Sequence, residues 1–75
     1  MILSNKQKKE IGKRIIYIRK DILGKTQKEM MKMLKVKQAM ISHFERGERL
    51  PSVEVLLTLN KASEKSIDWI LTGKD

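Results

Sequence analysis

The chain has 75 residues, with 17 lysines and arginines against nine aspartates and glutamates, and a formal net charge of +8. This length allows one domain, residues 1–75, and 40% apolar residues are enough to build its core. Without cysteine, disulfides, thiolate metal ligands and cysteine nucleophiles are excluded. No apolar run approaches about 18 residues, and the first ten residues soon become charged, so we expect neither a membrane span nor a secretory signal. The chain is therefore predicted to be a cytoplasmic protein.

The positive charge is concentrated in the first part of the chain. Residues 1–50 contain 14 of the basic residues and five of the acidic ones, a net charge of +9, whereas residues 51–75 have a net charge of −1. Such segregation favours a polyanion as the partner, because neutralised phosphates release condensed counterions. On charge alone, a solvated lysine-rich face fits the composition equally well.

The first two predicted helices lie before residue 35. The first spans about residues 5–22, with Ser4 or Asn5 as its N-cap and Gly24 as the left-handed break after it. The second spans residues 27–34, where Thr26 and Glu29 have the spacing of a capping box. The apolar spacing predicts the buried residues Ile11, Ile15, Ile18 and Ile22 in the first helix, and Met30, Leu34 and either Met31 or Met33 in the second.

Three further helices follow a brief turn, residues 35–37. The third spans residue 38 to about 46, with Ile41 and Phe44 inward, and Gly47 ends it. The fourth begins after Ser52, and the fifth spans residues 67–72 between Ser66 and Gly73. In the fourth helix the predicted inward residues are Val53, Leu56 and Leu57, with Asn60 or Lys61 at the boundary. No strand pattern is present, so the predicted fold is all-α with five helices.

Residues 27–46 have the organisation of a helix-turn-helix. Two short amphipathic helices joined by about three residues must cross steeply, because the turn is too tight for a side-by-side pair. In such a unit the second helix projects its N-terminal residues into the major groove. Its outer face here is polar and nearly uncharged, while lysines surround it at positions 28, 32, 35 and 37. The outward residues are Gln38, Ala39, Ser42 and His43, with Arg46 one turn further.

These features resemble the lambda-repressor-like helix-turn-helix domain, the Cro/cI or Xre type of phage repressors and bacterial regulators. The resemblance covers essentially the whole chain. Its marks, in order, are Thr26-Gln27, Gln38, Ile41, Phe44-Glu45-Arg46-Gly47, Pro51-Ser52 and the ending Ile67-Asp68-Trp69-Ile70-Leu71-Thr72-Gly73. The resemblance implies a compact five-helix domain with the helix-turn-helix at its second and third helices.

The resemblance also implies a function and a role for each site residue. The expected protein is a transcriptional regulator, and most simply a repressor, that binds a palindromic double-stranded operator as a homodimer. Base contacts are expected from Gln38, Ala39, Ser42, His43 and Lys37, and phosphate contacts from Gln27, Lys28, Arg46 and Arg49. Arg19 is the expected ion-pair partner of Glu45, with Lys20 as the second choice.

Three departures from the family pattern stand out. Met31 occupies a position that is usually small, where the two helices approach most closely. Lys35 stands where glycine is usual, and we expect it to adopt a positive φ at a cost of about 1 kcal/mol. The chain between Arg19 and Gln27 is one residue longer than usual.

Other functions have weaker support in the sequence. No catalytic constellation or glycine-rich phosphate loop is present, so we expect no enzyme, no cofactor and no small-molecule substrate. His43 is the only histidine, which leaves no basis for a metal site. Trp69 either packs over the first helix or Leu57, or lies at a dimer interface. The remaining alternative is a protein-interaction module of the same fold, of the antitoxin or anti-repressor kind.

Overall fold

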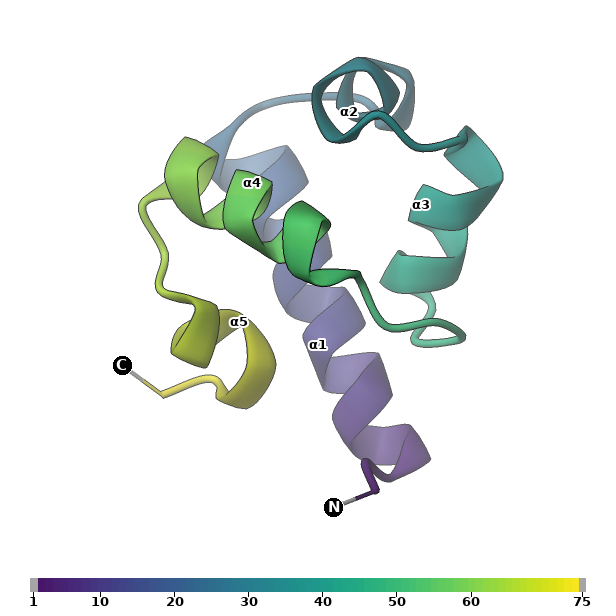
Figure 1. The fold of residues 1–75 in the computed structure, drawn as a ribbon, viewed down its shortest axis with the longest axis vertical. Coiled ribbons are helices and arrows are strands. Elements are labelled where there is room, and N and C mark those ends of the chain that lie inside the picture. The colour runs from purple at the N-terminus through teal and green to yellow at the C-terminus, as the bar shows by residue number, and fades with distance from the viewer. Residues whose placement is uncertain (1, 75) are drawn as a thin grey trace.

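The computed structural model describes residues 2–74, which form five α-helices and one π-helical turn (Figure 1). The elements in chain order are α1 (Asn5–Tyr17), η1 (Ile18–Ile22), α2 (Gln27–Leu34), α3 (Gln38–Glu45), α4 (Val53–Ser63) and α5 (Ile67–Thr72). Within this range there is no strand, so the all-α prediction is confirmed. No helix in the same range is long and apolar enough to cross a bilayer.

Side-chain caps explain why the helices begin where they do. Ser4 and Gln7 form a capping box at α1, and Thr26 and Glu29 form the expected one at α2. The hydroxyls of Ser52 and Ser66 accept hydrogen bonds from backbone amides three residues on, at the starts of α4 and α5. These bonds satisfy amide groups that the first turn of a helix leaves without a partner.

The first helix differs from the prediction in its last turn. Residues 18–22 are π-helical, and the backbone amide of Leu23 donates to the carbonyl of Ile18 at 2.9 Å. A π-turn holds one more residue than an α-turn, and the expected insertion between Arg19 and Gln27 has this same size. The π-helical turn thus has room for the extra residue.

Two non-glycine residues end helices in the left-handed region. Lys35, the expected one, has φ 57° at the end of α2. Glu64 has φ 62° at the end of α4, which the sequence did not indicate. Glu64 is the C-cap of α4, which ends at Ser63.

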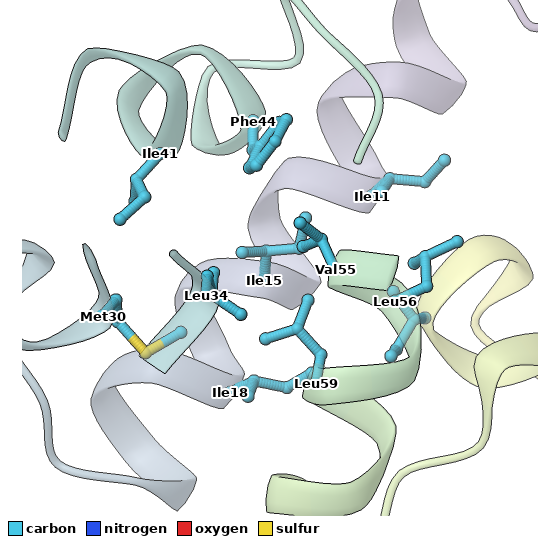
Figure 2. Packing of buried hydrophobic residues seen from close by; sticks show 11 residues of the cluster. Ile11, Ile15, Ile18, Met30, Leu34, Ile41, Phe44, Val55, Leu56 and Leu59 are labelled. Carbon is cyan, nitrogen blue, oxygen red and sulfur yellow. The ribbon is translucent and has the colours of Figure 1, made fainter. Parts of the chain in front are cut away.

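The core is formed by side chains from all six elements (Figures 1 and 2). Its buried side chains are Ile11, Ile15, Ile18, Met30, Leu34, Ile41, Phe44, Val55, Leu56, Leu59 and Ile70. Those predicted for the first three helices are all present except Ile22, which is only partly buried, as are Met31 and Met33. Figure 2 shows the side chains of α1, α2, α3 and α4 converging on one centre.

The prediction of buried residues in α4 was right for Leu56 and wrong for Val53 and Leu57. Leu56 is buried, but Val53 is 70% exposed and Leu57 is 44% exposed, whereas Val55 and Leu59 are buried instead. Because apolar residues occur on more than one side of this helix, their spacing does not define a single stripe. The face is decided by the way α4 packs on α2, η1 and α5.

Gly12 sets the distance between α1 and α3. A Cβ atom at this position would lie 2.5 Å from the carbonyl oxygen of Glu45 and 2.7 Å from that of Phe44. At Gly47, just after α3, a Cβ would lie 2.7 Å from the Cα of Lys9. The end of α3 is therefore in backbone-to-backbone contact with α1, which fixes the position of the third helix.

Candidate nucleic-acid interface

The residues predicted to contact bases lie together on the outer side of α3. Lys37, Gln38 and Ala39 are exposed, and Ser42 and His43 are half-buried one turn later. Positions 38, 39, 42 and 43 share one face because residues three and four apart are neighbours on a helix. The α3 side chains on the opposite face, Ile41 and Phe44, are buried in the core.

A hydrogen-bonded network connects this face to the interior. Arg19 Nε donates to Glu45 Oε2 at 2.6 Å and Arg19 Nη2 donates to Glu45 Oε1 at 3.1 Å. Both side chains are buried, 10% and 6% exposed, so the partner of Glu45 is Arg19 and not Lys20. Arg19 Nη1 also donates to the carbonyl of Lys25 at 3.0 Å, which ties the turn before α2 to the pair.

Gln27 extends this network from the ion pair to α3. Its Nε2 donates to Glu45 Oε1 at 3.0 Å. Its Oε1 accepts from Gln38 Nε2 and from Ser42 Oγ, each at 3.3 Å. One glutamine at the start of α2 thus orients two of the five predicted base-contacting side chains. The remaining amide hydrogen of Gln27 and its backbone N–H, at the first residue of α2, stay available for an anion.

A second cluster, formed by His43, Arg46 and Glu48, lies at the other end of α3. Arg46 donates from Nε to Glu48 Oε2 at 3.0 Å and from Nη2 to Glu48 Oε1 at 3.1 Å, while His43 Nδ1 lies 2.6 Å from Glu48 Oε1. The hydrogen bonds from Arg46, and then from His43, lower the pKa of the Glu48 carboxyl to about 2. The hydrogen bonds to Glu48 also raise the pKa of Arg46. Glu48 is therefore an anion on a surface that is otherwise basic.

The other predicted phosphate-contacting residues surround these clusters. Lys28 and Arg49 are exposed, and Arg49 lines a shallow hollow beside α3 together with Lys37 and His43. Ala39, Val36 and Met40 complete this hollow with apolar groups. Such a surface fits a small apolar group that has polar or anionic groups around it. The methyl group of thymine in the major groove is a group of this kind.

Three residues near this face were missed by sequence reasoning. Lys8 and Lys9 line a hollow with Arg46 and Glu48, because the N-terminal half of α1 passes beside the turn after α3. The run of lysines near the N-terminus signalled charge but not its place in the fold. Gly12 had a local signal, since a glycine inside a helical pattern often marks close packing.

Trp69 lies away from α3, on α5. Its ring is 5.9 Å from that of Tyr17 in α1, and Lys65 Nζ is 4.7 Å from the centre of the tryptophan ring. Trp69 is half-buried and packs against α1, one of the two arrangements expected from the sequence. Nearby, Arg14 donates to the carbonyls of Ile70 and Leu71 and so caps the end of α5.

The arrangement is suited to binding a partner with polar and anionic groups. Within residues 2–74, no three acidic or histidine side chains come together as metal ligands. Every buried side-chain nitrogen and oxygen in that range has a hydrogen-bond partner. The face of α3 presents amide, hydroxyl and imidazole groups, which form hydrogen bonds with base edges, inside a ring of cations that attract phosphates.

Comparison with known proteins gives consistent matches. The family model described as "Helix-turn-helix" matches residues 15–70. The HTH-type transcriptional regulator DicA of Escherichia coli (strain K12) is 40% identical over 65 residues, which cover 87% of this chain and 47% of DicA. The chain thus spans about half the length of this curated relative. The P22 c2 repressor protein, in its crystal structure with synthetic operator 9T in the presence of Tl+, is 41% identical with a TM-score of 0.76, over 85% of this chain and 96% of that one.

Proposed function

Because the chain belongs to the helix-turn-helix family, we propose that it is a sequence-specific DNA-binding transcriptional regulator, and most simply a repressor, acting in a bacterial or phage-infected cytoplasm. The observation that carries the proposal is the Arg19–Glu45–Gln27 network, which orients Gln38 and Ser42 on the outer face of α3. The similarity to the transcriptional regulator DicA and to a repressor solved with an operator supports the same function. No catalytic step is proposed.

Gln38 is the main base-contacting residue in this proposal. One hydrogen of its Nε2 is donated to Gln27, which leaves the other hydrogen and Oε1 free. This donor and acceptor match the N7 and N6 groups of adenine in the major groove. Ser42 and Lys37 are proposed to contact neighbouring bases, and Ala39 the methyl group of a thymine.

Phosphate contacts are proposed for Gln27, Lys28, Arg46 and Arg49. Gln27 offers its remaining amide hydrogen and the backbone N–H at the start of α2, where the helix dipole favours an anion. Lys28 and Arg49 are exposed cations near α3, and Arg46 is 58% exposed in its side chain. A phosphate would compete with Glu48 for Arg46, since both are anions that bind a guanidinium.

Selection of bound sites from random duplexes at low salt tests this function directly. The protein is expected to enrich a palindromic motif whose half-sites are about 10 base pairs apart. Gln38→Ala should relax the preference at one or two base pairs by about 1–3 kcal/mol, whereas Arg46→Ala should weaken binding to all sequences about equally. Lys61→Ala, an exposed lysine on α4, is the matched control and should leave both properties unchanged.

Two results would contradict this assignment. Failure to enrich any motif would favour the alternative, a protein-interaction module of the same fold. Uniform loss of affinity in both variants would show that the division into base-contacting and phosphate-contacting residues is wrong. Salt dependence separates the two functions further, because affinity for a duplex falls by about 0.9 log units per phosphate contact for each tenfold rise in salt.

A homodimer is proposed because a palindromic operator has the symmetry of two identical subunits. Trp69 is the proposed interface residue, since a half-buried tryptophan gains from further burial. Trp69→Ala should then lower the measured mass in solution or the cooperativity of operator binding, with the helical signal in circular dichroism unchanged. If Val53→Ser has this effect and Trp69→Ala does not, the interface lies instead on the exposed face of α4.

A further inference from the structure

In the second cluster, Glu48 holds the imidazole ring of His43 in place. Glu48 contacts His43 twice, because its backbone amide donates to the His43 carbonyl at 2.9 Å while its side chain meets the imidazole. The amide of Arg49 donates to the same carbonyl at 3.3 Å. The backbone of the turn is therefore attached to His43 by hydrogen bonds. These local bonds keep the Glu48 carboxylate beside His43 Nδ1, and no long-range contact is needed.

The contact determines which ring nitrogen of His43 carries the proton. An ionised carboxylate only accepts hydrogen bonds, so Nδ1 at 2.6 Å from Glu48 Oε1 must be the protonated nitrogen. In the neutral ring Nε2 is then an acceptor. Within residues 2–74, Nε2 has no hydrogen-bond partner, and since no unpaired polar atom there is buried, Nε2 is open to solvent.

We propose that Glu48 is a positioning residue for DNA recognition, which fixes the Nδ1–H tautomer of His43 and makes Nε2 a hydrogen-bond acceptor toward the base edge. This inference rests on the proposed function, in which His43 lies in the major groove. An acceptor there pairs with an exocyclic amino group, so His43 selects adenine N6 or cytosine N4 at one base pair of each half-site. The opposite tautomer would present a donor, which pairs with guanine N7 or O6, adenine N7 or thymine O4 and disfavours cytosine.

Charged groups from three parts of the fold lie near the ring of His43 and its partner Glu48. They are Arg46 just after α3, Lys37, Glu48 and Arg49 in the flanking turns, and Lys8 and Lys9 of α1 beside Glu48.

The first test measures the tautomer in the free protein. Long-range ¹⁵N–¹H NMR spectra of the imidazole at pH 8 should show a protonated Nδ1 and an unprotonated Nε2 in the wild type. In Glu48→Gln the amide can either donate or accept, so the two nitrogens should move toward averaged shifts. A wild-type ring protonated at Nε2 at this pH would overturn the proposal, whether or not the protein binds DNA.

The second test is selection of sites from random duplexes at pH 8. The wild type should prefer adenine or cytosine at one position of each half-site by about fivefold or more. Glu48→Gln should lose the preference at that position alone, and His43→Ala should also remove it. Loss of the Glu48 charge strengthens binding to all duplexes alike, and this uniform change does not alter relative enrichment.

The outcomes distinguish this inference from the proposed function. An enriched motif that Glu48→Gln and His43→Ala leave unchanged at every position overturns the positioning role, while the DNA-binding function stands. Lack of any enriched motif overturns both. The same loss at one position in Glu48→Gln and in His43→Ala, with no added effect in the double variant, supports the action of Glu48 through His43.

Discussion

Substitution of Gly12 by alanine tests the contact that positions α3. The glycine is buried in the middle of α1, against the last turn of α3. An added Cβ would lie 2.5 Å from the Glu45 carbonyl oxygen, about 0.9 Å closer than the 3.4 Å at which ordinary van der Waals contact begins. The contacting atoms belong to the α3 backbone, which cannot rotate away as a side chain does. Relief therefore requires the whole end of α3 to move.

Two effects of opposite sign determine the result. Alanine in a helix interior is more favourable than glycine by about 1 kcal/mol. Overpacking of a tight core costs about 1–3 kcal/mol, and a backbone obstacle places this site in the upper part of that range. We expect a net loss of about 1–2 kcal/mol, which lowers Tm by about 4–16 °C in a domain of this size. The displacement also moves Glu45 relative to Arg19, so affinity for DNA should fall.

Thermal unfolding followed by circular dichroism, together with binding to a selected duplex, measures both effects. Gly24→Ala is the matched control, because Gly24 has φ +61° and nothing lies within 4 Å of the added Cβ. It should lose about 1 kcal/mol through backbone strain and keep its DNA affinity. If Gly12→Ala melts at or above the wild-type temperature, the close approach of α1 and α3 is incorrect.

Three further substitutions and titrations test separate features. Arg19→Met should lower the free energy of unfolding, measured in urea, by about 3–5 kcal/mol, because it leaves the buried Glu45 carboxylate without its cation. A loss below about 1 kcal/mol would instead indicate that the pair behaves like an exposed salt bridge. Lys35→Gly should raise the free energy of unfolding by up to about 1 kcal/mol by removing left-handed strain, and an unchanged or lower stability in the same urea experiment would refute that strain. The Glu48 carboxyl should titrate near pH 2 in ¹³C NMR, and Arg46→Ala should return its midpoint toward 4.5. Because the pKa of Glu48 in the folded state lies below its unfolded value, the contribution of Glu48 to stability is complete above about pH 4.5 and is lost as pH falls toward 2. A wild-type midpoint near 4.5 would show that Arg46 and His43 do not hold the Glu48 carboxylate.

The buried ion pair has a consequence for specificity as well as for stability. Arg19 and Glu45 belong to η1 and α3, and Gln27 joins them from α2, so one network spans the three elements that form the helix-turn-helix and its support. A buried pair of this kind is often less stabilising than well-packed apolar residues would be. Its value here is that it orients Gln27, and through Gln27 the side chains of Gln38 and Ser42.

The sequence by itself determined the elements that depend on local interactions. The caps at Thr26, Ser52 and Ser66 lie where they were predicted, and Ser4 is the cap among the two candidates Ser4 and Asn5, because a hydroxyl bonds an amide only three residues away. The positive φ of Lys35 was expected from the resemblance to the family, which usually has glycine at this position. The all-α class and the buried stripes of the first three helices came from apolar spacing, since each of those helices has a single apolar face.

Only the tertiary structure decided features that depend on contacts between distant segments. The buried face of α4 was one, because Val53 and Leu57 are as apolar as Val55 and Leu59, and packing on α2, η1 and α5 selects between them. The place of Lys9 beside the turn after α3 was another. The charge of +8 described a basic protein, but the fold places Glu48 among those cations, in contact with His43 and Arg46. Composition contains no information about such pairing, because it arises where chain segments meet in space.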